Sequence, residues 1–225
     1  MKIKTSLSQL VALAMLTTLP GLAAAGVYED MLIALKSDNT PAAVALLDRG
    51  VDVNTVDIHG NTLVMLAVRE NNLDLLEQLL LRRARLNIRN RDGDTALRTA
   101  AFTGKLPFVQ RLVEAGAEVN MYGWSPLAYA AFNGHADVAA YLLKRGAEIN
   151  AVTENGSTAL LLAVRNGHQA AVDILLKHEA DPNIATERDE TALDWAVKTN
   201  NTDIAERLRK AGGRSGKMGT AEPSR

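Results

Sequence analysis

One pattern of apolar and polar positions returns along the chain. It begins with Thr or Ser, has an apolar residue two positions later and an alanine five positions later. The copies start at Thr62, Thr95, Ser125, Thr158 and Thr191. Successive starts lie 33, 30, 33 and 33 residues apart. A period in this range indicates supersecondary units that stack into a solenoid.

Each unit is predicted to form two short helices. The hydroxyl at its start suits a helix N-cap. Nine positions later stand residues that tolerate the left-handed turn closing a helix, namely Asn71, Gly104, Gly134, Gly167 and Asn200. A second apolar-striped helix ends near a glycine at offset 21 in three units. Arg83 and Glu179 take that offset in two others. Either these two side-chain-bearing residues adopt positive φ, or their helices end differently.

The same frame extends backwards to a first unit that starts at Glu29. Met31, Ala34, Leu46 and Gly50 then fall at its apolar, alanine and glycine offsets. The last unit carries Arg209 where the four preceding copies have Leu or Val, as expected for a terminal unit without a neighbour. We therefore predict an all-α domain of six helix pairs over residues 26–213. Residues 214–225 have no apolar period and are expected to be disordered.

These units resemble ankyrin repeats. The resemblance rests on the T-x-L-x-x-A phrase, the Asn-Gly-His turns at 133–135 and 166–168, the run from Leu142 to Asn150, and Gly60-Asn61-Thr62. It implies a solenoid of helix–turn–helix units joined by short β-hairpin fingers, with a concave groove that binds proteins. The family usually has histidine three positions after the start. Here that offset holds Met65, Arg98, Ala128, Leu161 and Asp194. With this row of histidines missing, cohesion between units is expected to rest more on apolar stacking.

One link between units is shorter than the others. Asn87 and Thr95 are eight positions apart, whereas Asn120 and Ser125 are five apart, and the short link contains Tyr122 and Trp124. The resemblance places partner contacts in the fingers and at offset seven, which holds Arg69, Phe102, Phe132, Arg165 and Lys198. The rings would then cluster in mid-groove, as aromatic and arginine anchors do in protein interfaces. The alternative is that the rings fill a gap left by the short finger.

An arginine-rich run extends from Arg82 to Arg91. It would suit an anionic partner, or it is a solvated helix end. The candidate partner-binding residues are therefore Arg69, Arg91, Phe102, Tyr122, Trp124, Phe132 and Arg165.

No catalytic residue, cofactor site or metal site is expected. His135 and His168 share an offset in adjacent units, and stacked units lie too far apart for both rings to bind one metal ion. The chain has no cysteine, and no phosphate-binding glycine loop of a known type. The hydroxyls at the unit starts are expected to be used as caps. A polar pocket with convergent histidine and carboxylate groups would reopen the enzyme hypothesis.

The N-terminus resembles a secretion signal. Lys2 and Lys4 precede the apolar run Leu10 to Leu19, and three alanines follow at positions 23–25. This arrangement predicts a signal peptide over residues 1–25, cleaved after Ala25. The alternatives are an uncleaved anchor or a buried N-terminal helix. Without cysteine there is no lipid anchor on that residue, so a soluble periplasmic protein is expected, with secretion as the alternative.

Function follows from these expectations. A net charge of −1 gives no reason to expect nucleic acid as a partner. We expect a monomer without stable membrane insertion that binds another exported protein as a scaffold or helper. The alternatives are an inhibitor or immunity protein that neutralises a toxic enzyme, and a secreted effector that binds host proteins.

Overall fold

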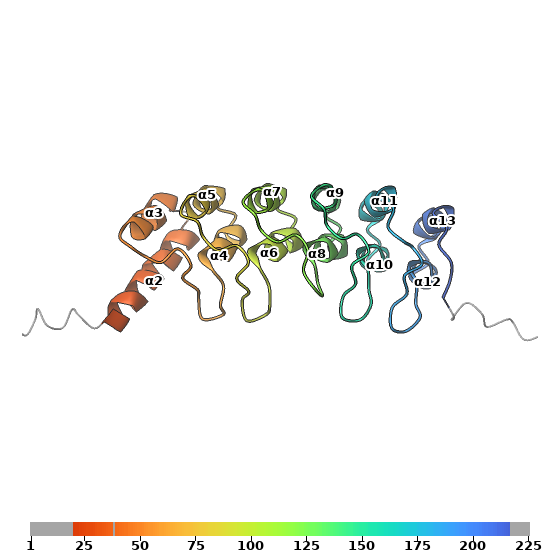
Figure 1. Ribbon diagram of the computed structural model, residues 1–225, viewed down its shortest axis with the longest axis horizontal. Helices are drawn as coiled ribbons and strands as arrows, with labels where there is room; N and C mark the ends of the chain where they lie inside the picture. Colours follow the sequence, from red (N-terminus) through yellow and green to blue (C-terminus); the bar gives the residue numbers. More distant parts are fainter. Residues whose placement is uncertain (1–19, 38, 217–225) are drawn as a thin grey trace, which may run out of the picture.

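The computed structural model describes residues 20–37 and 39–216. Within them the chain forms six pairs of helices: α2 (Pro20–Lys36) with α3 (Thr40–Asp48), α4 (Leu63–Arg69) with α5 (Leu73–Leu81), α6 (Ala96–Phe102) with α7 (Leu106–Glu114), α8 (Pro126–Phe132) with α9 (Ala136–Lys144), α10 (Ala159–Arg165) with α11 (Gln169–Lys177), and α12 (Ala192–Lys198) with α13 (Thr202–Lys210). The pairs stand side by side in one row (Figure 1). The predicted all-α solenoid of six units is confirmed.

In the five units that start with Thr or Ser, the hydroxyl caps the first helix, as predicted. The side chains of Thr62, Thr95, Ser125, Thr158 and Thr191 each accept the backbone N–H three residues later. In the last unit, the carboxylate of Asp194 also accepts the N–H of Thr191, which completes a capping box. These bonds satisfy N–H groups that a short helix cannot pair internally.

Left-handed residues close the helices. Arg83 and Glu179 have φ of 58° and 66°, so the first of the two alternatives for this offset is correct. Both residues occupy a conformation that favours glycine and asparagine. The backbone therefore forms the same left-handed turn at this offset in every unit, even in the two units where arginine or glutamate occupies it.

The core runs through the stack as one continuous cluster. The apolar residue at offset two and the alanine at offset five are buried in each unit, as in Leu97 with Ala100 and Leu160 with Ala163. First helices pack directly on first helices, α6 on α8 and α8 on α10. Alanine allows this close approach because it carries only a methyl group.

Hydrogen bonds between units accompany the apolar stacking. Asparagine side chains join consecutive units: the Oδ1 atoms of Asn54, Asn87, Asn120, Asn150 and Asn183 accept N–H groups of Arg85, Glu118, Glu148, Asp181 and Arg214 at 2.8 to 3.0 Å. His135 and His168 each bond through Nε2 to a carbonyl oxygen of the preceding unit, that of Phe102 or Phe132. Polar side chains therefore do join neighbouring units, but from offsets other than the family's histidine position.

Both ends of the domain extend beyond a standard unit. Helix α2 spans the predicted cleavage site after Ala25, while residues 1–19 of the predicted signal peptide lie outside the described part. At the other end, Arg214 bonds to Asn183 and Gly216 donates its N–H to Asp194, past the predicted boundary at 213. Residues 217–225 of the predicted tail lie outside the described part. Across residues 20–37 and 39–216, no helix has the length and apolar character needed to span a bilayer.

Candidate functional site

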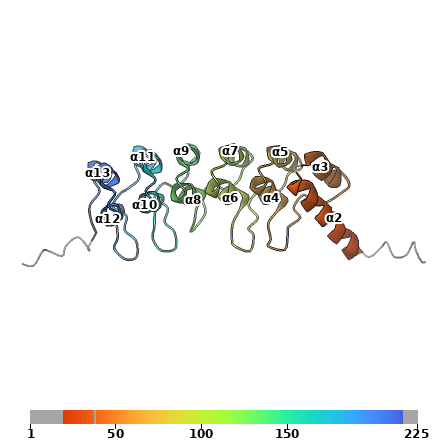
Figure 2. The same ribbon diagram turned by 180° about the vertical axis from the view of Figure 1, so that it is seen from behind.

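The links that lead to the first helices form a row of fingers along one edge of the stack, opposite the second helices (Figures 1 and 2). Four have the same hairpin tip: finger 1 (57–61), finger 2 (90–94), finger 4 (153–157) and finger 5 (186–190). In each, the first N–H bonds to the fifth carbonyl, as from Asp57 to Asn61 at 2.9 Å. Finger 3 (121–124) is the shortened one and lacks this bond.

Beside finger 3 lies a continuous group of rings, the aromatic patch, made of Phe102, Trp124, Tyr129 and Phe132. Tyr129 lies at the centre, 5.6 Å from Phe102 and 5.1 Å from Trp124 between ring centroids. Trp124 meets Phe132 edge-on at 5.4 Å. Phe102 is 46% exposed, so the patch reaches the surface, while Tyr129 is half-buried against the core. Such pairs hold rings in fixed orientations.

Cations extend the patch towards the C-terminal end. The guanidinium of Arg165 lies 6.0 Å from the ring of Phe132 and 5.7 Å from that of Trp195. The ammonium of Lys198 lies 4.4 Å from the ring of Trp195. First helices α6 to α12 thus present rings and cations in alternation, a composition typical of interface anchors.

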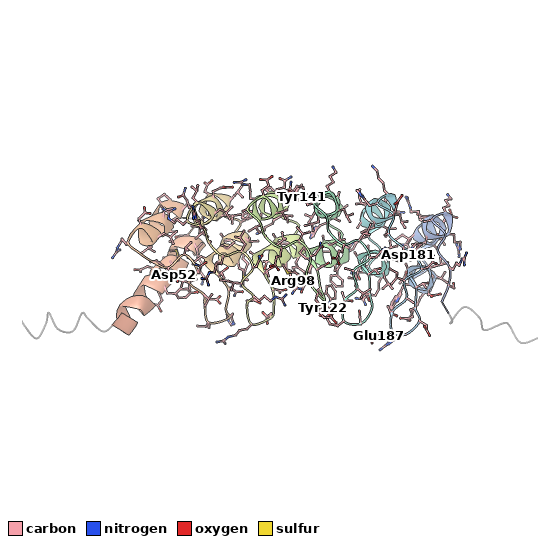
Figure 3. The ribbon with its side chains drawn as sticks, in the orientation of Figure 1. Asp52, Arg98, Tyr122, Tyr141, Asp181 and Glu187 are labelled. Atoms are coloured by element: carbon pink, nitrogen blue, oxygen red, sulfur yellow. The ribbon has the colours of Figure 1, made fainter. Side chains whose placement is uncertain are left out.

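Only four of the seven candidate partner-binding residues lie together at the aromatic patch. Phe102, Trp124, Phe132 and Arg165 come together. Tyr122 is 84% exposed on finger 3, and among the described residues its ring contacts no other ring or cation. Figure 3 places it at the finger edge, away from Tyr141 at the opposite edge.

The two remaining arginines lie outside the patch. Arg91 lies on finger 2, where its N–H bonds to the carbonyl of His59. Arg69 lines a hollow beside α2. Of the four rings predicted to cluster, Phe102, Trp124 and Phe132 do so and Tyr122 does not.

Tyr129 and Trp195 belong to the site and were missed by the sequence reasoning. Both stand at offset four of their units, one helical turn before the residue at offset seven. Residues three apart on a helix share a face, so the helical period was the signal that would have found them. Burial and the carboxylate of Asp94 raise the pKa of Tyr129 to about 12, and its hydroxyl bonds to that carboxylate at 3.2 Å.

A buried arginine holds finger 3 in place. Arg98 is 6% exposed, and its Nη atoms donate to the carbonyl oxygens of Gly93 and Tyr122, each at 2.9 Å. Burial, with nearby Arg89, lowers the pKa of Arg98 from its usual value. The residue at the family's histidine offset is thus a bridge between finger 2 and finger 3.

The hollow beside α2 has a volume of about 500 Å³ and contains histidine and carboxylates, so it is the place to test for catalysis. Its Asp57 carboxylate already accepts hydrogen bonds from the N–H of His59 and from the N–H and side chain of Asn61. Burial alone would raise the pKa of Asp57, but these bonds outweigh it and lower the pKa. A carboxylate saturated in this way maintains the finger rather than acting as a base. Within residues 20–37 and 39–216, no three metal-ligating side chains are grouped to hold an ion.

Comparison with known proteins agrees with this architecture. A family model described as ankyrin repeats in three copies matches residues 64–153 and 146–216, and one described as ankyrin repeats in many copies matches residues 31–80. The crystal structure of an ankyrin repeat domain from Acinetobacter baumannii AYE superposes with a TM-score of 0.75 at 29% identity, covering 82% of this chain and 98% of that one.

Curated relatives match shorter stretches. The Notch-regulated ankyrin repeat-containing protein of Homo sapiens is 37% identical over 86 residues, 35% of this chain and 75% of that protein. The ankyrin repeat and SAM domain-containing protein 6 of Rattus norvegicus is 42% identical over 78 residues, 33% of this chain. The chain spans only 9% of that longer relative's length.

Proposed function

The chain belongs to the ankyrin-repeat family of protein-interaction modules, and from that premise we propose that it binds another exported protein through its first-helix and finger face, as a scaffold or helper. The aromatic patch is the observation that carries the proposal. Rings fixed by mutual contact lose little freedom on binding, so their burial converts efficiently into affinity.

The charges around the patch support a partner with acidic side chains near its apolar contact. Arg165 has cation–π contacts with two rings, and no hydrogen bond or ion pair of its guanidinium is formed within the described part. A carboxylate of the partner could therefore pair with it without breaking an existing bond.

Substitution in the patch tests this proposal. Trp124→Ala should weaken the partner by at least about 2 kcal/mol if this ring is an interface hot spot. Leu81→Ala is the matched control, because it truncates an apolar side chain that is 74% exposed on a second helix, away from the fingers. Isothermal titration against a partner purified from a periplasmic extract gives both affinities. Equal affinity of a folded Trp124→Ala protein and the wild type would refute the patch as the binding site.

We propose the periplasm as the compartment, with the signal peptide removed after Ala25. The basic start, apolar run and alanines of the N-terminus support this. Expression in a Gram-negative host followed by osmotic shock tests it, with mass spectrometry of the released chain. A mature mass beginning at Gly26 in the shock fluid is expected, and an uncleaved chain retained in the cytoplasm would contradict the proposal.

A further inference from the structure

A pocket of about 340 Å³ lies between fingers 4 and 5, next to the aromatic patch. Both fingers contribute to its walls, and α10 and α12 contribute Arg165 and Trp195. Arg165 also contacts the ring of Phe132, so the pocket continues the proposed binding face. Figure 3 places Glu187, another lining residue, at the free edge of the finger row. The pocket therefore extends from a finger tip to the first helices.

Two of the lining residues carry buried polar atoms that form no hydrogen bond with a described residue. These atoms are Oγ of Ser157 and Nε1 of Trp195. Ser157 is only 1% exposed. A buried polar group without a partner costs free energy, so a bound group that bonds to these atoms is favoured. Both atoms are covered from water, so small rotations of the two side chains accompany such bonds.

The charged side chains of the pocket nearly balance. Arg165 and Arg188 line it together with Glu187 and Glu190. Glu190 is 8% exposed and pairs with Lys198 at 3.5 Å, whereas Glu187 and Arg188 are exposed. Arg165 and Glu190 share the pocket but form no ion pair with each other. An occupant must therefore satisfy a guanidinium and a carboxylate at the same time.

A carboxamide meets this requirement, because its oxygen accepts hydrogen bonds and its NH₂ group donates them. A carboxylate would pair with Arg165 but would be repelled by Glu190. An ammonium group would pair with Glu190 but would be repelled by Arg165 and Arg188. Glutamine has the longer of the two carboxamide side chains, which suits a pocket that extends from a finger tip to the helices.

We propose that this pocket binds a glutamine side chain of the partner protein. The carboxamide oxygen accepts from the guanidinium of Arg165 and the indole N–H of Trp195. The NH₂ group donates to the carboxylate of Glu190 and the hydroxyl of Ser157, so all four bonding positions of the carboxamide are used. A guanidinium has five N–H donors, so Arg165 can still pair with an acidic side chain at the patch. The proposal rests on the proposed function of the same face.

A small amide tests the pocket directly. The probe is N-acetylglutamine methylamide, added to the full chain labelled with ¹⁵N. The chain has two tryptophans, so the indole N–H signal of Trp195 reports on the pocket and that of Trp124 is the internal control. We expect a saturable shift of the Trp195 signal with a Kd on the order of 1 mM, as the size of the probe allows. The N-acetylglutamate and N-acetyllysine methylamides should bind at least about fivefold more weakly, because each brings a like charge into the pocket.

Three variants test the individual contacts. Glu190→Gln removes the buried carboxylate, so the preference for the glutamine compound over the glutamate compound should fall below about twofold. Ser157→Ala should weaken the glutamine compound several-fold without lowering the urea midpoint, because Oγ has no partner in the free chain. Arg165→Ala should weaken the compound at least about fivefold. Arg69→Ala, at the same offset of another unit, is the matched control and should not. Circular dichroism checks that each variant keeps its helices.

Four outcomes would overturn the proposal. These are no saturable shift of the Trp195 signal, equally tight binding of a charged compound to the wild type, an unchanged preference in Glu190→Gln, and equal losses from Arg165→Ala and Arg69→Ala. If Trp124→Ala weakens the protein partner but the glutamine compound does not bind, the proposed function stands and the pocket alone fails. If the compound binds as expected but Trp124→Ala leaves the partner's affinity unchanged, the aromatic patch fails and the pocket stands.

Discussion

The guanidinium of Arg98 on α6 donates a 2.9 Å hydrogen bond to the carbonyl oxygen of Tyr122 on finger 3. A second bond of the same length joins it to Gly93 on finger 2. Within the described residues, no backbone hydrogen bond joins finger 3 to finger 2, whereas the N–H of Arg91 on finger 2 bonds to the carbonyl of His59 on finger 1. The buried side chain of Arg98 therefore joins the short finger 3 to finger 2, as the backbone bond from Arg91 to His59 joins finger 2 to finger 1.

Replacing this arginine should release finger 3. Arg98→Leu loses two charge-assisted hydrogen bonds, so we expect the free energy of unfolding to fall by about 2 to 4 kcal/mol. Urea denaturation measures the loss. Amide exchange at Gly123 and Trp124 should accelerate more than exchange in α12, because the effect begins at the finger.

Arg91→Leu is the control for this experiment. Arg91 is exposed on finger 2, and its bond to His59 uses only its backbone, so stability should change by less than about 0.5 kcal/mol. If both variants lost the same stability, the bridge would have no special role.

Alanine substitution at two turn glycines distinguishes the energetic cost of backbone strain from that of side-chain crowding. Gly116 and Gly134 have φ of 94° and 76°, so alanine is strained at both. An added β-carbon meets nothing within 4 Å at Gly116, but it lies 2.5 Å from Nδ1 of His168 at Gly134. His168 would have to move, and its bond to the carbonyl of Phe132 would be disturbed.

Thermal and urea unfolding of the two variants should therefore differ. Gly116→Ala is expected to cost about 1 kcal/mol, as a residue with a side chain does in the left-handed region. Gly134→Ala should cost at least about 1 kcal/mol more because of the crowding. Equal losses would show that the inter-unit histidine bonds contribute little.

Structural features that recur in every unit could be predicted from the sequence, whereas contacts that occur in a single unit could not. Hydroxyl caps, left-handed turns and buried alanines recur at fixed offsets because every unit solves the same local problem. Arg98 occurs once, and its bonds depend on how close two fingers of different length approach. The helical period does place Tyr129 on the face of Phe132, but its contacts with Phe102 and Trp124 join three separate segments, and no local pattern encodes those contacts.

The half-buried phenol of Tyr129 predicts weaker stability at high pH. Its pKa is raised to about 12, mainly by burial. A raised folded-state pKa contributes stability that is complete below the ordinary pKa of about 10 and is lost as the pH rises from about 10 to about 12. Tyr129→Phe removes the ionisable group, so its free energy of unfolding should decline less across this range.

Urea unfolding at a series of alkaline pH values measures that decline. Tyr122→Phe, which removes a phenol from an exposed ring, is the matched control and should follow the wild type. A Tyr129→Phe protein that loses stability as steeply as the wild type would mean that other groups cause the alkaline transition.

Removal of residues 1–25 should leave the stack intact. The repeat frame of the first unit begins at Glu29, and Met31, Ala34 and Leu35 of α2 are buried in the core. Gly26 is exposed, so a chain starting there keeps the contacts of these three side chains. We expect its free energy of unfolding to equal that of the full chain within about 0.5 kcal/mol.

Denaturation of the two chains in urea, followed by circular dichroism, compares them directly. Met31→Ala in the shortened chain is the positive control, because loss of a fully buried side chain should cost about 2 to 5 kcal/mol. A shortened chain destabilised as much as this control would show that the segment before Gly26 is part of the folded unit. Its removal after Ala25 would then be incompatible with a stable mature protein, because the first helix pair would lose part of its packing.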